Sequence, residues 1–316
     1  MDMRDIMAYY LVPTVWLDAP PIPGNRTQFD LNTEEVMQPF QFSIGIRAKA
    51  LRGGLFLFDF TGWPGEREQI RKSTEEFSKL LLRQTNIINT QIVCLYTALS
   101  QDQQMFPYQG LLATPDTIIQ VGSFEDNAPM AIKYPESDEI IGFSMLRDKS
   151  SIISIPIVKQ SFDILESILN RRDSERIILF SNLLLRGLKA FEEFDYSFCL
   201  TTSWTLIEAL LQQRWGEYIA ANRTRTLNGD NVPFINSDRR ERLNDSRTFS
   251  VSVISEILSL LEWLPLNLYL EIAKLRKLRN DWVHSLQQVE RSDAETSLEI
   301  AQTLLNLIGN MDFQVI

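Results

Sequence analysis

The sequence predicts an α+β protein in which a β-containing N-terminal domain precedes an all-α helical bundle. Short strand-like runs occur in the first half of the chain, whereas the second half shows helical periodicity almost throughout. A chain of 316 residues is long enough for two domains. We place them at residues 1–153, an α/β or β-rich domain, and at residues 154–316, a helical domain.

Two strand-like runs and a turn characterise the N-terminal domain. Residues 40–47 alternate apolar residues with polar or small ones, as a half-buried strand does. Leu55–Phe60 is a β-rich apolar run of strand length, and Arg52-Gly53-Gly54 before it is typical of a hairpin turn. The rest of the domain predicts a helix over about 66–82, continuing as far as about 99, and short strands and loops over 105–150.

The C-terminal domain predicts a compact bundle of helices. Pro156 marks its start, and Pro265 separates two of its helices. Asp173-Ser174-Glu175 and Ser292-Asp293 are typical of helix N-termini. The predicted helices cover about 158–171, 174–193, 196–221, 249–263, 266–280 and 292–310.

Composition and charge exclude several classes of protein. Hydrophobic residues make up 44% of the chain and charged residues 23%, and no apolar run reaches the ~18 residues of a transmembrane helix. The acidic start Met1-Asp2-Met3-Arg4-Asp5 differs from a secretory signal, so we expect a cytoplasmic protein with no membrane partner. The net charge is −10, with −6 up to residue 150 and −4 after it. A general binder of polyanions is therefore excluded, and binding of RNA would need a local basic surface.

The two cysteines lie in apolar contexts, Ile92-Val93-Cys94-Leu95 and Ser197-Phe198-Cys199-Leu200. We expect two reduced, buried thiols. No spacing of cysteines and histidine matches a zinc site. With one histidine and no carboxylate motif, we expect neither a catalytic metal nor another cofactor.

His284 is the only histidine, and it closes the run Leu278-Arg279-Asn280-Asp281-Trp282-Val283-His284. An unperturbed imidazole titrates close to neutrality, so it can take or give a proton at cellular pH. An arginine presents a planar fork of donors that suits phosphate oxygens. Arg279, Asn280 and His284 could therefore handle a phosphodiester without a metal. A lone histidine near a helix end more often caps carbonyls or lies at the surface, and that interpretation stays open.

Arg279 ends an apolar stripe of the predicted helix. The stripe consists of Leu268, Ile272, Leu275 and Arg279, spaced four, three and four residues apart. A charge on such a stripe needs a partner, and Glu208 in the otherwise apolar segment Trp204–Leu211 is the candidate. An ion pair that only fastens two helices and a supporting role of Glu208 in a site both remain possible.

The spacing within the run raises a geometrical question. Arg279 and His284 are five residues apart, which is about 140° around a straight helix. Either the helix ends between them, or the two residues act in a site shared by two chains. No proline or glycine lies between them to mark a break.

Arg279-Asn280, three residues and then His284 resembles the R-x4-6-H signature of the HEPN superfamily in its common R-N-x-x-x-H form, notably among Apea-like members. The leucine-bearing stretch Leu275–Asn280 and the glutamate-bearing segment Trp204–Leu211 resemble the corresponding helices of that family. The resemblance covers about residues 158–310 and leaves residues 1–150 unassigned. It implies an all-α bundle that dimerises.

Many members of this family are metal-independent endoribonucleases with a composite site from two protomers, whereas others have lost catalysis and bind ligands or partners. The resemblance implies that Arg279 holds the phosphate and stabilises the charge of the transition state. It implies that His284 is the general base on the ribose 2′-OH or the general acid on the leaving 5′-oxygen, and that Asn280 orients the phosphate or the histidine. The product would be a 2′,3′-cyclic phosphate, and the 2′-OH would select RNA over DNA.

One position departs from a subgroup of the family. Members paired with a nucleotidyltransferase antitoxin commonly have a tyrosine two residues after the histidine, where this chain has Leu286. Regulation by tyrosine modification at this position is therefore excluded.

A second candidate site is an arginine-rich segment. Residues 222–247 predict a loop with one short helix near 237–244, and Trp215 and Tyr218 precede it as possible stacking rings. The candidate RNA-binding residues are Arg214, Arg223, Arg225, Arg239, Arg240 and, on the motif helix, Lys277. The alternative is a solvated loop whose charges are offset by Asp230, Asp238, Glu241 and Asp245.

We therefore expect a metal-independent endoribonuclease that cleaves an RNA substrate through the 2′-OH and forms a homodimer through its helical domain. A regulatory protein or ligand would act on the N-terminal domain. By analogy with the family, the setting is prokaryotic stress response or defence. The alternative is a non-catalytic HEPN module for dimerisation and for binding of a partner or ligand.

Overall fold

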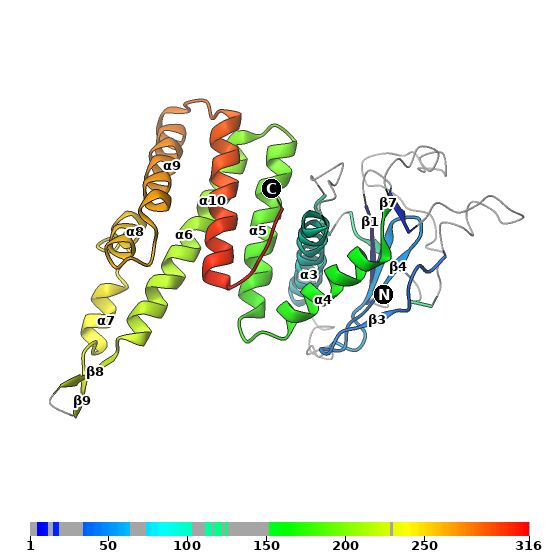
Figure 1. Cartoon of the computed structure of the whole chain (residues 1–316), viewed down its shortest axis with the longest axis horizontal. Helices are drawn as coiled ribbons and strands as arrows, with labels where there is room; N and C mark the ends of the chain where they lie inside the picture. Colours follow the sequence, from blue (N-terminus) through cyan, green and yellow to red (C-terminus); the bar gives the residue numbers. More distant parts are fainter. Residues whose placement is uncertain are drawn as a thin grey trace, which may run out of the picture. The chain divides into compact units, whose positions relative to one another are not determined.

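The computed structural model describes residues 5–11, 15–18, 34–63, 74–102, 111–115, 117–121, 124–125, 152–227 and 230–315. Within these ranges most strands lie in the N-terminal part and most helices in the C-terminal part, and the fold class is α+β, as predicted (Figure 1). The chain divides into two compact units, Met1–Leu185 with Val315 and Arg186–Gln314 with Ile316. The division falls within helix α5 (Ser174–Glu192), whereas the sequence prediction placed a domain boundary between residues 153 and 154.

A five-stranded antiparallel sheet in the order β3-β4-β5-β1-β6 forms the centre of the first unit. Its strands are β1 (Ile6–Tyr10), β3 (Phe40–Gln41), β4 (Arg47–Leu51), β5 (Leu55–Asp59) and β6 (Ile119–Gln120). Strands β2 (Trp16–Leu17) and β7 (Ile152–Ile153) make a separate parallel pair. The hairpin turn predicted at Arg52-Gly53-Gly54 is confirmed, since it joins β4 to β5 and Gly54 has a φ of 85°.

The single strand predicted over residues 40–47 is wrong, because the chain turns inside it. The amide of Gly45 donates to the Phe42 carbonyl at 3.0 Å, and Gly45 has a φ of 87°. A Cβ on Gly45 would lie 2.3 Å from the carbonyl oxygen of Gly62, so only glycine fits there. Phe42 and Ile46 are both buried, so the alternating pattern predicts the burial of these side chains correctly but does not predict the turn between them.

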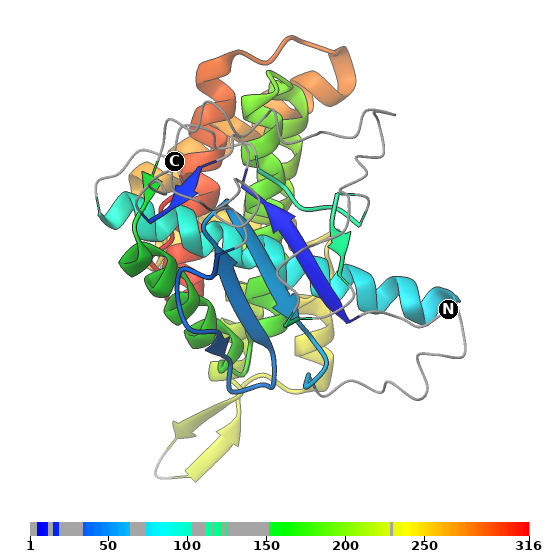
Figure 2. The same ribbon diagram turned by 90° about the vertical axis from the view of Figure 1, so that its right-hand side faces the viewer.

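Helices α3 (Thr74–Gln101) and α4 (Ile155–Leu169) cover one face of the sheet (Figure 2). The hydroxyl of Tyr9 on β1 donates to the side chain of Gln91 on α3. Phe162 of α4 is fully buried. Its ring lies 5.5–6.2 Å from those of Phe40, Phe42, Phe56 and Phe58.

Both helices bear on the sequence predictions. The expected start of the first helix near residue 66 lies outside the described residues, and its continuation to about residue 99 is confirmed. Helix α4 begins at Ile155 with Pro156 in its first turn, as predicted.

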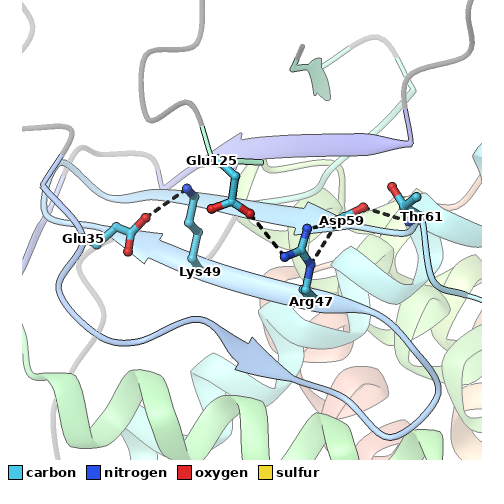
Figure 3. Close-up of polar contacts among 6 residues, drawn as sticks. All are labelled: Glu35, Arg47, Lys49, Asp59, Thr61 and Glu125. Atoms are coloured by element: carbon cyan, nitrogen blue, oxygen red, sulfur yellow. Dashed lines mark hydrogen bonds and ion pairs between the residues drawn. The ribbon is translucent and has the colours of Figure 1, made fainter. Parts of the chain in front are cut away.

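The opposite face of the sheet carries a network of charged side chains (Figure 3). Arg47 on β4 and Asp59 on β5 face each other across the strands, with Nη2 and Oδ2 2.6 Å apart. Arg47 also pairs with Glu125 at 3.2 Å. Lys49 is fully buried and pairs with Glu35 at 3.0 Å. The network fastens Glu35 and Glu125, from distant parts of the sequence, to the sheet.

Asp59→Asn is expected to lower the free energy of unfolding by about 1–3 kcal/mol near neutral pH. Burial raises the pKa of Asp59, but hydrogen bonds from Thr61 and Arg47 outweigh it and leave the pKa below its ordinary value. A carboxyl whose pKa is lower in the folded state stabilises the fold above its unfolded pKa of about 4, and this contribution is lost as the pH falls through the folded pKa.

Urea unfolding between about pH 3 and pH 7 measures this difference. The gap between wild type and Asp59→Asn should shrink below about pH 4, and a gap that does not change with pH would contradict the assignment. Glu125→Gln is the control, because that carboxylate is 75% exposed and its pair with Arg47 should contribute less than about 1 kcal/mol.

The second unit is helical and contains one hairpin. Its elements, beyond the last part of α5, are α6 (Tyr196–Ala221), β8 (Thr224–Leu227), β9 (Asp230–Pro233), α7 (Ser237–Leu243), α8 (Val251–Leu260), α9 (Leu266–Ser285) and α10 (Arg291–Gly309). Helix α6 packs along α10 and also contacts α8 and α9. Gly187 of α5 permits close packing, since a Cβ there would lie 2.9 Å from Leu298 of α10. Of the helices in the described ranges, none is long and apolar enough to cross a membrane.

Candidate active site

Helix α9 carries Arg279, Asn280 and His284 without interruption. It ends at Ser285, so the predicted end near residue 280 is wrong, and the helix does not break between Arg279 and His284. The chain leaves the helix at Leu286, which has a φ of 52° and donates its amide hydrogen to the Trp282 carbonyl at 2.8 Å. Arg279 and His284 therefore lie about 140° apart around one helix and do not converge within one chain.

Arg279 is half-buried, and its surroundings differ from the prediction. Its Nη1 donates to Oδ1 of Asn280 at 3.1 Å, while its Nε is buried with no hydrogen-bond partner. Glu208 is half-buried on α6, and in the described part of the chain no ion pair joins it to Arg279. The predicted Glu208–Arg279 ion pair is therefore not formed, because Arg279 turns to its neighbour Asn280 instead. A buried guanidinium N–H without an acceptor costs about 1–3 kcal/mol.

His284 is exposed in the last turn of α9. The helix as a whole is weakly buried: Ile272 and Leu275, the centre of the predicted apolar stripe, are its buried residues. Exposed apolar side chains lie at both ends, with Leu266 66% and Leu286 79% exposed. The only imidazole of the chain is thus presented to solvent, or to a second chain, on a helix that keeps apolar surface uncovered.

Among the described residues, four buried polar atoms have no hydrogen-bond partner, three on α6 and one on α9. In the described residues they are Ser203 Oγ, Trp204 Nε1, Gln213 Oε1 and Arg279 Nε. Trp204 also borders a small cavity of about 60 Å³, together with Ser255, Tyr269 and Arg276. Neither Arg276 as a lining residue nor this cavity could be predicted from the sequence, because the lining comes from three helices whose packing is a tertiary property. The cavity has room for water or for a small polar group.

The six candidate RNA-binding residues do not form one surface. Arg223, Arg225, Arg239 and Arg240 gather around β8, β9 and α7. Arg214 on α6 instead pairs with Glu217 at 3.2 Å and lies 4.6 Å above the ring of Trp263. Lys277 on α9 borders a separate shallow hollow of about 480 Å³.

The rings of Trp215 and Tyr218, which were possible stacking rings for bases, are stacked on each other with centroids 5.6 Å apart. Trp215 also stacks on Phe249 at 5.5 Å and donates through Nε1 to the Leu243 carbonyl at 2.9 Å. These rings stabilise the fold of the segment. Trp215 is stacked against Tyr218 and Phe249, so its ring is not open to stack on a base.

The cysteines and the carboxylates of the described residues were candidate metal ligands. Cys94 and Cys199 are free and buried, as expected. In the ranges that the structure describes, no group of three or more His, Cys, Asp or Glu side chains could hold a metal ion.

Neither thiol is expected to react with Ellman's reagent while the protein is folded. Burial raises the pKa of Cys94 far above its ordinary value and raises the pKa of Cys199 to about 12. Because the thiolate is the reactive species, both should stay inert at about pH 8. Both should react once the protein is unfolded in urea, and rapid modification of either one without urea would contradict the burial described above.

Comparison with known proteins gives no match: no family model, no curated protein and no solved structure is similar to this chain.

Proposed function

We propose that this protein is a metal-independent endoribonuclease that cleaves RNA through the ribose 2′-OH, at a site that two copies of the chain build from helix α9. The observation that carries the proposal is the state of Arg279 and His284. Arg279 is held against Asn280 with a buried N–H unpaired, and the only histidine is exposed farther along the same helix. The resemblance of Arg279, Asn280 and His284 to the HEPN signature supports the same reading.

The residues have complementary chemical roles. The Arg279 guanidinium binds the phosphate and stabilises the negative charge that develops in the transition state. Asn280 positions that guanidinium through its 3.1 Å contact. His284 accepts the proton of the 2′-OH as the oxygen attacks phosphorus, or donates a proton to the departing 5′-oxygen. The P–O5′ bond breaks, and the products are a 2′,3′-cyclic phosphate and a 5′-hydroxyl.

Two chains are needed because a phosphate on Arg279 lies on a different side of α9 from His284 of the same chain. A second copy, related by a two-fold axis, can present its His284 to that phosphate. The uncovered apolar side chains of α9, among them Leu266, Leu270 and Val283, favour this helix as the contact surface. We place such an enzyme in the cytoplasm, in stress response or defence, with its N-terminal unit receiving a regulatory protein or ligand.

The test is cleavage of end-labelled RNA by the purified chain in the presence of EDTA. We expect cleavage fragments ending in 2′,3′-cyclic phosphate, and no cleavage of the same oligonucleotide made with 2′-deoxyribose throughout. Cleavage that stops in EDTA, or that also cuts the deoxy oligonucleotide, would contradict the proposed chemistry. A chain that dimerises but leaves all RNA intact would be the non-catalytic module.

A further inference from the structure

Residues 223–227 and 230–249 form a basic arm on an acidic protein. It comprises β8, β9, α7 and the turns that follow, and we call it the arginine arm. It holds six arginines, no lysine and four acidic residues, a net charge of +2 in a chain whose net charge is −10. The positive charge of this arm is therefore local.

Most of these arginines are not neutralised by contact. Arg247 pairs with Asp245 at 3.3 Å. Among the described residues, the side chains of the other five make no ion pair: Arg223, Arg225, Arg239, Arg240 and Arg242. Among the acidic residues that were expected to offset these arginines, only Asp245 forms an ion pair with an arginine of the arm in the described residues.

Several of the guanidinium groups are held in place. Arg225 and Arg239 lie over the ring of Phe234, at 3.8 and 4.5 Å from its centroid. Arg239 also donates to the Phe234 carbonyl at 3.0 Å. Arg240 and Arg242 are exposed and border an open hollow of about 1120 Å³. Stacking on a ring orients a guanidinium and reduces the entropy lost when it binds an anion.

The residue types indicate which anion the arm binds. Arginine, rather than lysine, forms two parallel hydrogen bonds with a phosphate group. Phe234 is covered by guanidinium groups, and Trp215, Tyr218 and Phe249 are stacked among themselves. The arm can therefore bind phosphates without stacking on bases, which makes binding independent of sequence and dependent on salt.

We propose that the arginine arm anchors a nucleic-acid strand by its phosphates, at the end of the helical unit opposite the C-terminal end of α9 (Figure 1). The choice of RNA rests on the proposed ribonuclease function, whereas phosphate binding by the arm does not. Helix α9 has 20 residues and is about 30 Å long. A strand with the stacked spacing of about 3.4 Å per nucleotide spans the length of this helix with roughly 9 nucleotides.

The experiment measures binding of fluorescent single-stranded RNA, about 20 nucleotides long, to the full chain carrying His284→Ala, so that the RNA stays intact. The arm variant adds Arg240→Gln and Arg242→Gln. The matched control adds Arg172→Gln and Arg176→Gln, which remove the same charge from exposed positions outside the arm. DNA of the same sequence and polyglutamate are the competitors.

We expect the arm variant to raise the Kd about tenfold at low salt, with a shallower dependence on salt concentration, and the control to bind like its parent. RNA and DNA should compete similarly, and polyglutamate should not compete. The proposal would be overturned if the arm variant and the control lost affinity equally, or if neither lost affinity. It would also be overturned if the His284→Ala parent did not bind the RNA. Displacement by polyglutamate would assign the arm to an acidic protein partner. Each of these outcomes is independent of whether the wild-type chain cleaves RNA.

Discussion

Replacing His284 by alanine is expected to lower the rate of RNA cleavage by about 10²–10⁴-fold, because the reaction then lacks its proton-transfer group. Arg279→Ala should lower the rate by about 10²–10³-fold, since the developing charge on the phosphate loses its main donor. Both losses should appear in kcat at saturating RNA, measured with a labelled oligonucleotide in EDTA. His284 is the only histidine, so no other imidazole can replace it.

The controls lie on the same helix. Ser285→Ala changes the exposed neighbour of His284, and Lys274→Ala removes an exposed charge whose 2.6 Å pair is with Glu271. Both variants should cleave RNA at the wild-type rate. If His284→Ala cleaves RNA at a rate within a factor of about three of wild type, His284 takes no part in the mechanism, because general acid–base catalysis contributes at least about 10²-fold.

Phe162→Ala is expected to have the largest effect on stability, a loss of about 3–5 kcal/mol in the free energy of unfolding. Phe162 is fully buried and contacts four other phenylalanine rings on the sheet. Its removal deletes buried apolar surface and leaves a cavity that surrounding rings cannot fill. Denaturant unfolding followed by circular dichroism measures the change.

Phe198→Ala is the matched control, because Phe198 is 52% exposed. This second substitution should change the free energy of unfolding by less than about 0.5 kcal/mol. Similar losses in the free energy of unfolding for the two substitutions would mean that Phe162 of α4 does not pack into the core of the first unit as described.

The long helices could be predicted from the sequence, whereas the sheet could be predicted only in part, at β5 and the turn before it. Helices α5 and α6 follow their predicted ranges within about one residue. Helix α5 is amphipathic and begins at the predicted start Asp173-Ser174-Glu175. Helix α6 instead has apolar residues around most of its circumference, and the side chain of Asp195 caps its start by accepting from the Phe198 amide at 3.0 Å. Strand β1 was missed although Ile6–Tyr10 is an apolar run that lies between β5 and β6. Its pairing partners are about 50 and 110 residues away, and no local pattern contains them.

The residues of the candidate site could be identified from the sequence, but not their contacts. The apolar stripe of α9 is confirmed at Ile272 and Leu275, which are buried. The predicted ion pair of Arg279 with Glu208 was wrong. A half-buried guanidinium can bind either of two nearby polar groups, and the choice depends on helix positions to within about 1 Å. The end of α9 was also missed, since Leu286 takes a left-handed conformation that leucine rarely adopts.

The most direct test of the shared site is a heterodimer of two inactive variants. One chain carries Arg279→Ala and the other His284→Ala, each with a different affinity tag, and the mixed dimer is isolated after co-expression. If the phosphate-binding Arg279 and the acting His284 come from different chains, one of the two sites is intact, and we expect about half the cleavage rate of the wild-type dimer. If both residues act within one chain, neither site is intact. A mixed dimer as inactive as either homodimer, or the absence of any mixed dimer, would contradict the shared site on α9.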